Sequence, residues 1–147
     1  MKNNSQKEQN EKKKEALNEY LDALKEVRYW AEKLETMRRS NQYHTPSATA
    51  VRSGGGPADP TRKALEELEH TEQAAATAKK YAQEAKDRVL SLIRMAPTAD
   101  QRVLLMRHYI DGMSWEDAAE AEGKSRTWAT NNHGTALLYI HLPGEVK

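Results

Sequence analysis

The fold is decided by residues 102–140, RVLLMRHYIDGMSWEDAAEAEGKSRTWATNNHGTALLYI, which contain two helix-start signals close together. Ser114 precedes Trp-Glu-Asp, so its hydroxyl can cap the free amides of a new helix. Ser125 repeats this arrangement eleven residues later, after Gly123, a residue type that tolerates the positive φ at which helices end. We therefore expect a short helix from Ser114, a turn, and a longer helix from Ser125 to about His141.

A further helix is expected just before these two, over about residues 99–111. Pro97 opens it and Gly112 closes it, and its apolar residues are spaced as one buried face. These apolar residues are Val103, Leu104, Met106, Tyr109 and Ile110. Residues 97–147 are thus expected to form a helix-turn-helix module.

The first 39 residues are predicted to form one amphipathic helix, with a frayed, polar start over the first ten. No Gly or Pro interrupts residues 11–39, and apolar residues recur at spacings of three and four, which is a heptad pattern. The recurring residues are Leu17, Tyr20, Leu24, Val27, Ala31 and Leu34.

Residues 40–60, SNQYHTPSATAVRSGGGPADP, lose this periodicity and are predicted to be a flexible Gly/Pro linker. The glycine run lacks the Gly-Lys-Ser/Thr ending of a phosphate-binding loop. Residues 61–96 then form a second helix whose seam is mostly alanine, namely Leu68, Thr71, Ala75, Ala78, Ala82, Ala85, Val89 and Leu92.

Small seam residues let two helices approach closely, so the two long helices suit each other as an antiparallel hairpin. The alternative is that each helix pairs with its own copy in another subunit, since an alanine seam buries little area. The expected fold is therefore all-α: a long, coiled-coil-like antiparallel helical hairpin followed by a C-terminal helix-turn-helix.

The module over residues 97–147 resembles region 4 of bacterial sigma factors, and more closely the small phage and prophage regulators of the ArpU and RinA type. The resemblance covers about 40 residues and rests on RHYIDGMSWEDAA at 107–119, then Gly123, Ser125 and HGTAL at 133–137. It implies that the helix after Ser125 contacts double-stranded DNA in the major groove. The implied DNA-binding residues are Lys124, Ser125, Arg126, Thr127, Thr130, Asn131 and His133.

Each assignment has a structural alternative. Arg126 could bind a guanine edge or a phosphate and Asn131 an adenine, or both could be solvated polar residues on an exposed face. His133 is expected to pack or to contact a phosphate. Trp128 is expected to pack in a core or interface, or else to stack on bases from the exposed face.

Gly134 lies inside the expected helix, where a glycine costs about 1 kcal/mol of stability relative to alanine. This cost suggests that the preceding helix passes close to Gly134.

Four positions depart from the family, which prefers aliphatic residues where this chain has Ala118, Glu122, Ala129 and Asn132. The core of the module is therefore expected to be under-filled, with Trp115 and Trp128 as compensation.

The composition excludes several functions. The chain has 147 residues, of which 37% are hydrophobic and 31% charged, and it contains no Phe. Because it also contains no Cys, a disulfide framework and a cysteine zinc site are ruled out. The histidines lack metal-ligand spacing, and no catalytic pattern is present. We expect no enzyme, no metal and no cofactor. The polar start and the lack of a long apolar run predict a soluble, intracellular protein with no membrane association. The resemblance to phage and prophage regulators implies a location in the cytoplasm of a bacterial host.

Charge bears on the partners. The chain carries +1 overall, but residues 98–147 have five Lys and Arg against seven Asp and Glu, or −2. Because phosphate neutralisation supplies much of DNA affinity, a monomer should bind weakly, and a homo-oligomer is expected. The leading hypothesis is a DNA-binding transcriptional regulator. The alternatives are an adaptor that docks on RNA polymerase, and the small DNA-binding subunit of a phage terminase.

Overall fold

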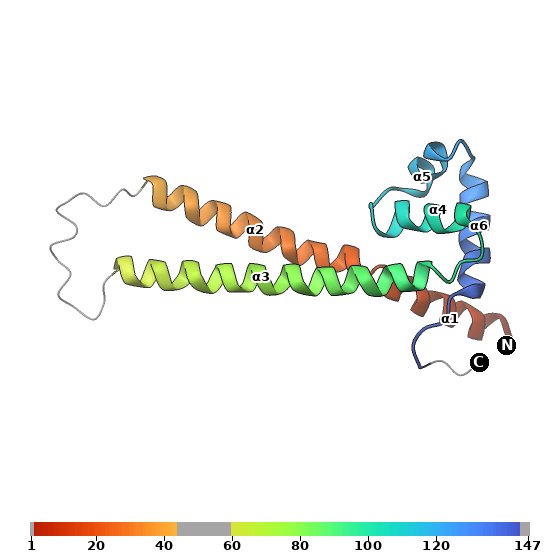
Figure 1. Cartoon of the computed structure of the whole chain (residues 1–147), viewed down its shortest axis with the longest axis horizontal. Coiled ribbons are helices and arrows are strands. Elements are labelled where there is room, and N and C mark those ends of the chain that lie inside the picture. The colour runs from red at the N-terminus through yellow and green to blue at the C-terminus, as the bar shows by residue number, and fades with distance from the viewer. Residues whose placement is uncertain (1, 44–59, 145–147) are drawn as a thin grey trace. The chain divides into compact units, whose positions relative to one another are not determined.

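A computed structural model describes residues 2–43 and 60–144 of the chain (Figure 1). These residues are helical apart from short turns and contain no strand, so the all-α prediction is confirmed. The helices are α1 (Lys2–Leu17), α2 (Glu19–Tyr43), α3 (Pro60–Ile93), α4 (Ala99–Tyr109), α5 (Trp115–Ala121) and α6 (Arg126–Tyr139).

The N-terminal segment differs from the single helix with a frayed start that the sequence suggests. It is helical from Lys2 and is divided at Asn18 into α1 and α2. Asn18 is still bonded to both helices: its amide donates to the Lys14 carbonyl and its carbonyl accepts from the Asp22 amide, both at 2.9 Å. The predicted linker overlaps the end of α2 at residues 40–43, and its residues 44–59 lie outside the described part.

The chain divides into two compact units. The first comprises Met1–Ala23 and Ala82–Lys147, and the second comprises Leu24–Tyr81. Helices α2 and α3 each contribute residues to both units. The first unit holds α1 together with α4, α5 and α6, and so contains the whole C-terminal module.

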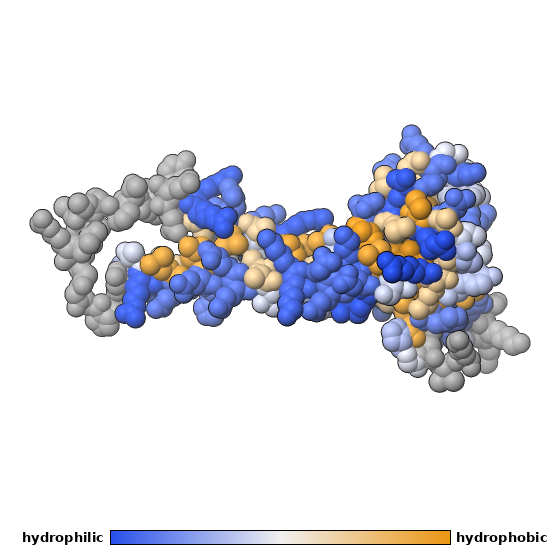
Figure 2. All heavy atoms as spheres, viewed as in Figure 1, coloured by the Kyte–Doolittle hydropathy of each residue, from blue (hydrophilic) through white to orange (hydrophobic). Residues whose placement is uncertain are grey.

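In the second unit, the alanine seam of α3 lies against α2. Thr71, Ala75 and Ala78 are buried, and shallow grooves are lined jointly by Trp30 of α2 and Ala74 of α3. On the face drawn in Figure 2, apolar side chains gather between these two helices and hydrophilic ones flank them. The second half of the seam, Ala82, Ala85, Val89 and Leu92, is buried in the first unit.

The main core of the first unit joins the two ends of the chain. Leu17, which the heptad pattern assigns to a hairpin seam, is fully buried beside residues of the C-terminal module such as Tyr109, Leu137 and Ile140. Next to it, the buried Lys13 donates a hydrogen bond of 2.8 Å to the Leu137 carbonyl. This carbonyl lies in the last turn of α6, where a cation is favourable because of the helix dipole.

A smaller core cluster consists of Leu104, Ala118, Ala119 and Ala129. Because three of its four members are alanine, larger side chains must cover it. Trp115, Trp128 and Met113 pack against it, each half-buried. Of the two alternatives for Trp128, packing is therefore the one observed, and the tryptophans compensate for the small residues as the sequence predicts.

Candidate nucleic-acid interface

The first two helices of the C-terminal module are joined at Gly112, whose φ is +76°. Helix α4 begins after Thr98, whose hydroxyl accepts from the Gln101 amide at 3.1 Å. Helix α5 begins after Ser114, whose hydroxyl accepts from the Asp117 amide at 3.1 Å. The helix start that the sequence predicts at Ser114 is thus present, and a side-chain cap stabilises it.

The turn between α5 and α6 occupies residues 122–125. Gly123 has a φ of +70°, and its amide donates to the Glu120 carbonyl at 2.9 Å. The Lys124 amide donates to the Ala119 carbonyl at 2.8 Å, so the carbonyls at the end of α5 are satisfied. Ser125 then caps α6 by accepting from the Trp128 amide at 3.1 Å. These local bonds fix α5 and α6 as two separate helices.

Helix α6 has one polar, exposed face and one buried face. Ala129, Ala136 and Leu137 are buried. The sequence-predicted residues Lys124, Ser125, Arg126, Thr127, Thr130 and Asn131 are all exposed, so they lie together at the start of α6. The Ser125 hydroxyl is occupied by its cap and the Thr130 hydroxyl by a bond of 3.1 Å to the Thr127 carbonyl.

Arg126 is exposed but is not unpaired. Its guanidinium donates to the Glu116 carboxylate of α5 at 3.0 Å, and both side chains are about two-thirds exposed. Lys124 lies 5.9 Å from the centre of the Trp128 ring, within the range of a cation–π contact. The cations of this face are therefore held in place by neighbours on the same module.

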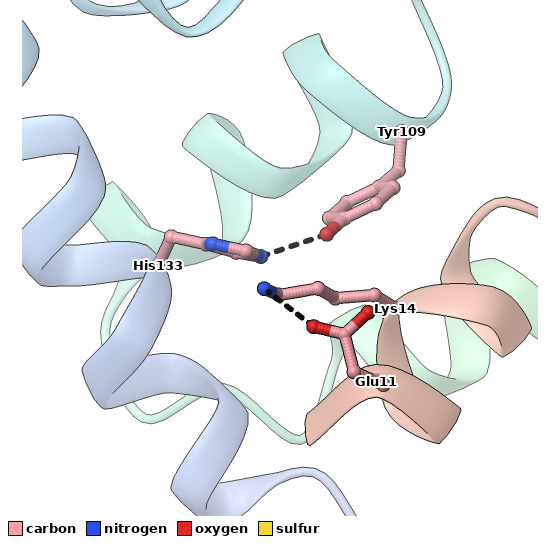
Figure 3. A network of polar contacts seen from close by, with 4 residues as sticks. All are labelled: Glu11, Lys14, Tyr109 and His133. Carbon is pink, nitrogen blue, oxygen red and sulfur yellow. Dashed lines mark hydrogen bonds and ion pairs between the residues drawn. The ribbon is translucent and has the colours of Figure 1, made fainter. Parts of the chain in front are cut away.

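His133 does not belong to the exposed face. It is half-buried, and its Nε2 forms a hydrogen bond of 2.7 Å with the Tyr109 hydroxyl of α4 (Figure 3). Burial, with smaller contributions from Lys14 and His108, lowers the pKa of His133 to about 4. Because the ring is half-buried and its Nε2 is bonded to Tyr109, packing is the alternative that the structure shows.

Sequence reasoning missed the cluster to which His133 belongs. The imidazole of His108 stacks on Trp115 with ring centres 3.7 Å apart, and His133 lies 4.3 Å from Trp115. His108 donates from Nδ1 to the Met113 carbonyl at 2.7 Å, and burial lowers the pKa of His108. Burial likewise raises the pKa of the Tyr109 phenol. The sequence signal was only the presence of these ring side chains in three successive helices.

Glu122 and Asn132, at two of the positions where aliphatic residues were expected, have hydrogen-bond partners. Glu122 accepts from Arg107 at 2.8 Å. Asn132 donates to the Trp128 carbonyl at 2.9 Å and accepts from Gln101 at 3.3 Å. These bonds hold α6 to α4 and to its own first turn.

The explanation that the sequence suggests for Gly134 is wrong. A Cβ built at Gly134 would meet no atom within 4 Å, apart from the backbone of its own helix. No neighbouring helix therefore requires a glycine at this position.

Within residues 2–43 and 60–144, no three His, Asp or Glu side chains are grouped as metal ligands. Of the helices in the same ranges, none combines the length and the apolar character needed to cross a bilayer. Comparisons of the chain with models of protein families, with curated proteins and with solved structures find no match.

Proposed function

We propose that this chain is a DNA-binding transcriptional regulator of phage or prophage type. In this proposal α5 and α6 form a helix-turn-helix similar to that of sigma region 4, and α6 enters the major groove. Helices α2 and α3 form an antiparallel hairpin that pairs two or more copies of the chain.

The observation that carries the proposal is the exposed polar face at the capped start of α6. It combines a cation, Arg126, with side chains that donate and accept hydrogen bonds, Thr127, Thr130 and Asn131. These are the groups that bind base edges and phosphates in a major groove. Lys124 precedes them at the turn, where it can contact the DNA backbone.

The charge of the module favours an oligomer. Because residues 98–147 carry −2, one copy has few phosphate contacts available. Two linked copies double those contacts and raise the affinity through the effective concentration of the second site. The mass in solution tests this arrangement: a dimer is expected for a regulator, whereas a ring of eight or more copies would favour the terminase alternative.

The experiment is selection of bound duplexes from a random-sequence DNA pool, followed by fluorescence anisotropy on the enriched sequence at two salt concentrations. Replacement of Arg126 by Ala together with Asn131 by Ala should weaken binding about 10- to 100-fold, as loss of base contacts does. The matched control is Lys80→Ala, which removes one exposed cation from α3. It should change affinity less than about twofold, since it lies outside the module.

Two outcomes contradict the proposal. One is the absence of any enriched sequence and of binding by the wild type at low salt. The other is equal affinity of the double variant and the Lys80→Ala control. In either case the face at the start of α6 would not contact DNA.

An adaptor that docks on RNA polymerase is the second candidate. Its supporting observations are the net −2 of the module and the ion pair that occupies Arg126 with Glu116. If the chain is an adaptor, a pull-down with the purified chain as bait should recover polymerase subunits, and the chain should not bind DNA at low salt.

A further inference from the structure

The first unit contains an open groove of about 470 Å³, and of the proposed DNA contacts only Thr130 lines it. Helix α1 and the residue after it supply one side, with Asn10, Lys14 and Asn18 at spacings of four. The aromatic cluster supplies the other, with His108, Trp115 and His133. A volume of this size is typical of small-molecule sites.

Two polar side chains in this groove lack protein partners. Asn10 and Asn18 are half-buried, and within the described part of the chain their side-chain amides make no hydrogen bond. Partly buried amides are normally satisfied by protein, water or ligand. Both amides line the groove together with His108, Trp115 and His133. If this part of the chain served only to pack against those rings, apolar residues would be expected at the two positions.

Gly134 also lines the groove. A glycine inside a helix costs about 1 kcal/mol relative to alanine. Since a Cβ there meets nothing within 4 Å, close packing does not account for that cost. Its one structural effect is to leave the space above α6 unfilled, at the position where the groove runs past the helix.

The charge of the groove comes from one residue. Among the described residues that line it, Lys14 alone carries a permanent charge. Its ammonium lies between the Glu11 carboxylate, at 3.5 Å, and the ring of His133 (Figure 3). Glu11 is 60% exposed and belongs to the same helix, so it can turn to solvent when another anion arrives. His133 and Tyr109 add no charge at pH 7, because burial lowers the pKa of the imidazole to about 4 and a phenol is neutral at that pH.

We propose that this groove binds a small planar aromatic acid. The ring of the ligand lies against Trp115 and His133, its carboxylate binds the Lys14 ammonium, and polar edge groups bond the amides of Asn10 and Asn18. Gly134 keeps the space for the ring open. The proposal does not rest on the proposed function, because neither its observations nor its test involves DNA.

The test is titration of the full chain with 2-naphthoate, followed by NMR. Two comparison probes isolate the parts of the site: 2-naphthamide lacks the charge, and cyclohexanecarboxylate lacks the aromatic ring. We expect saturable binding of 2-naphthoate, with shifts confined to the Trp115 indole N–H and the Asn10 and Asn18 amides. The amide and the saturated acid should each bind more weakly.

Matched variants locate the charge and the space. Lys14→Met should weaken 2-naphthoate about fivefold, as loss of a partly exposed ion pair does, and leave 2-naphthamide unchanged. Lys12→Met removes the same charge from an exposed position of α1 and should have no effect. Gly134→Leu should abolish binding by filling the groove, whereas Gly134→Ala should retain it.

Three results would overturn the proposal: no saturable binding to the wild type, equal binding of the acid and the amide, or wild-type affinity in folded Gly134→Leu. Circular dichroism checks the fold of each variant. If Gly134→Leu does not fold, the affinities of Lys14→Met and Lys12→Met for 2-naphthoate test the site instead. These two variants are comparable because both replace a lysine on the same helix. Equal affinities in that pair would likewise refute the site.

Discussion

Arg126 extends from the first turn of α6 and forms an ion pair with Glu116 of α5. In the proposed complex the guanidinium must exchange this carboxylate for a phosphate or a base edge. An exposed pair of this kind contributes no more than about 1 kcal/mol, so the exchange is easily reversed. In the proposed complex Glu116 would therefore compete with DNA for the Arg126 guanidinium.

Replacement of Glu116 by Gln should strengthen DNA binding about threefold beyond the effect of lost charge alone, since an exposed pair is worth about 0.2–1 kcal/mol. The control is Glu120→Gln, which removes one charge from another exposed position of α5. Anisotropy on the selected duplex measures both. Equal affinities of the two variants would show that the ion pair does not compete with DNA.

His133 predicts how the first unit responds to acid. Its pKa is lowered to about 4 in the folded chain, mainly by burial, then by the charge of Lys14 and by His108. The unfolded chain, with a pKa near 6.5, binds the proton more readily between these values. The free energy of unfolding should therefore fall by about 2 kcal/mol from pH 7 to pH 5 on account of this group, and remain level above pH 7.

Urea unfolding at a series of pH values measures this dependence. His133→Gln removes the titrating group and should flatten the profile in that range, leaving the smaller contribution of His108, whose pKa is lowered in the same direction. His141→Gln replaces an exposed histidine outside the cluster and should keep the wild-type profile. A wild-type profile in His133→Gln would mean that the imidazole is not buried as described.

At the scale of elements, two glycines of the C-terminal module have opposite roles. Gly123 ends α5 at a φ of +70°, where a side chain is strained. Gly134 lies inside α6 with open space at its Cβ. The same substitution should therefore have opposite effects at the two positions.

Gly123→Ala should destabilise the chain by about 1 kcal/mol or more, because alanine resists a positive φ. Gly134→Ala should stabilise it by up to about 1 kcal/mol through helix propensity. Each variant serves as the control for the other in denaturant unfolding. A loss of stability in Gly134→Ala would indicate a close neighbour that the structure does not contain.

Some elements of this fold can be predicted from the sequence and others cannot. Helix starts at Ser114 and Ser125 were predictable because a cap and its amide lie within three residues of each other. The packing of α1 against the C-terminal module could not be predicted. Apolar residues at spacings of three and four show which face of a helix is apolar but not which element covers that face. The cluster around His133 depended on that same packing and was missed for the same reason.

At the scale of the whole molecule, α1 belongs to the core of the C-terminal module. Leu17 is fully buried among residues of α3, α4 and α6. The module thus includes residues from both ends of the chain, and residues 97–147 do not complete its core. A fragment restricted to those residues would expose the surface that Leu17 covers.

Leu17→Ala should lower the stability of the full chain by about 2–5 kcal/mol, as deletion of a buried leucine does. Leu65→Ala, at a position that is 55% exposed, should cost less than about 0.5 kcal/mol. Thermal unfolding compares the two. Similar melting temperatures would mean that α1 does not form part of the core.

The bond between Lys13 and the Leu137 carbonyl joins residues that are 124 positions apart. During translation the lysine is made 124 residues before the carbonyl that accepts its hydrogen bond. Until then α1 can pack on α3 and α4 but not on the end of α6. A product that ends before residue 137 would thus lack this bond and the end of α6, and if the proposed function holds it should not bind the DNA site of the full chain.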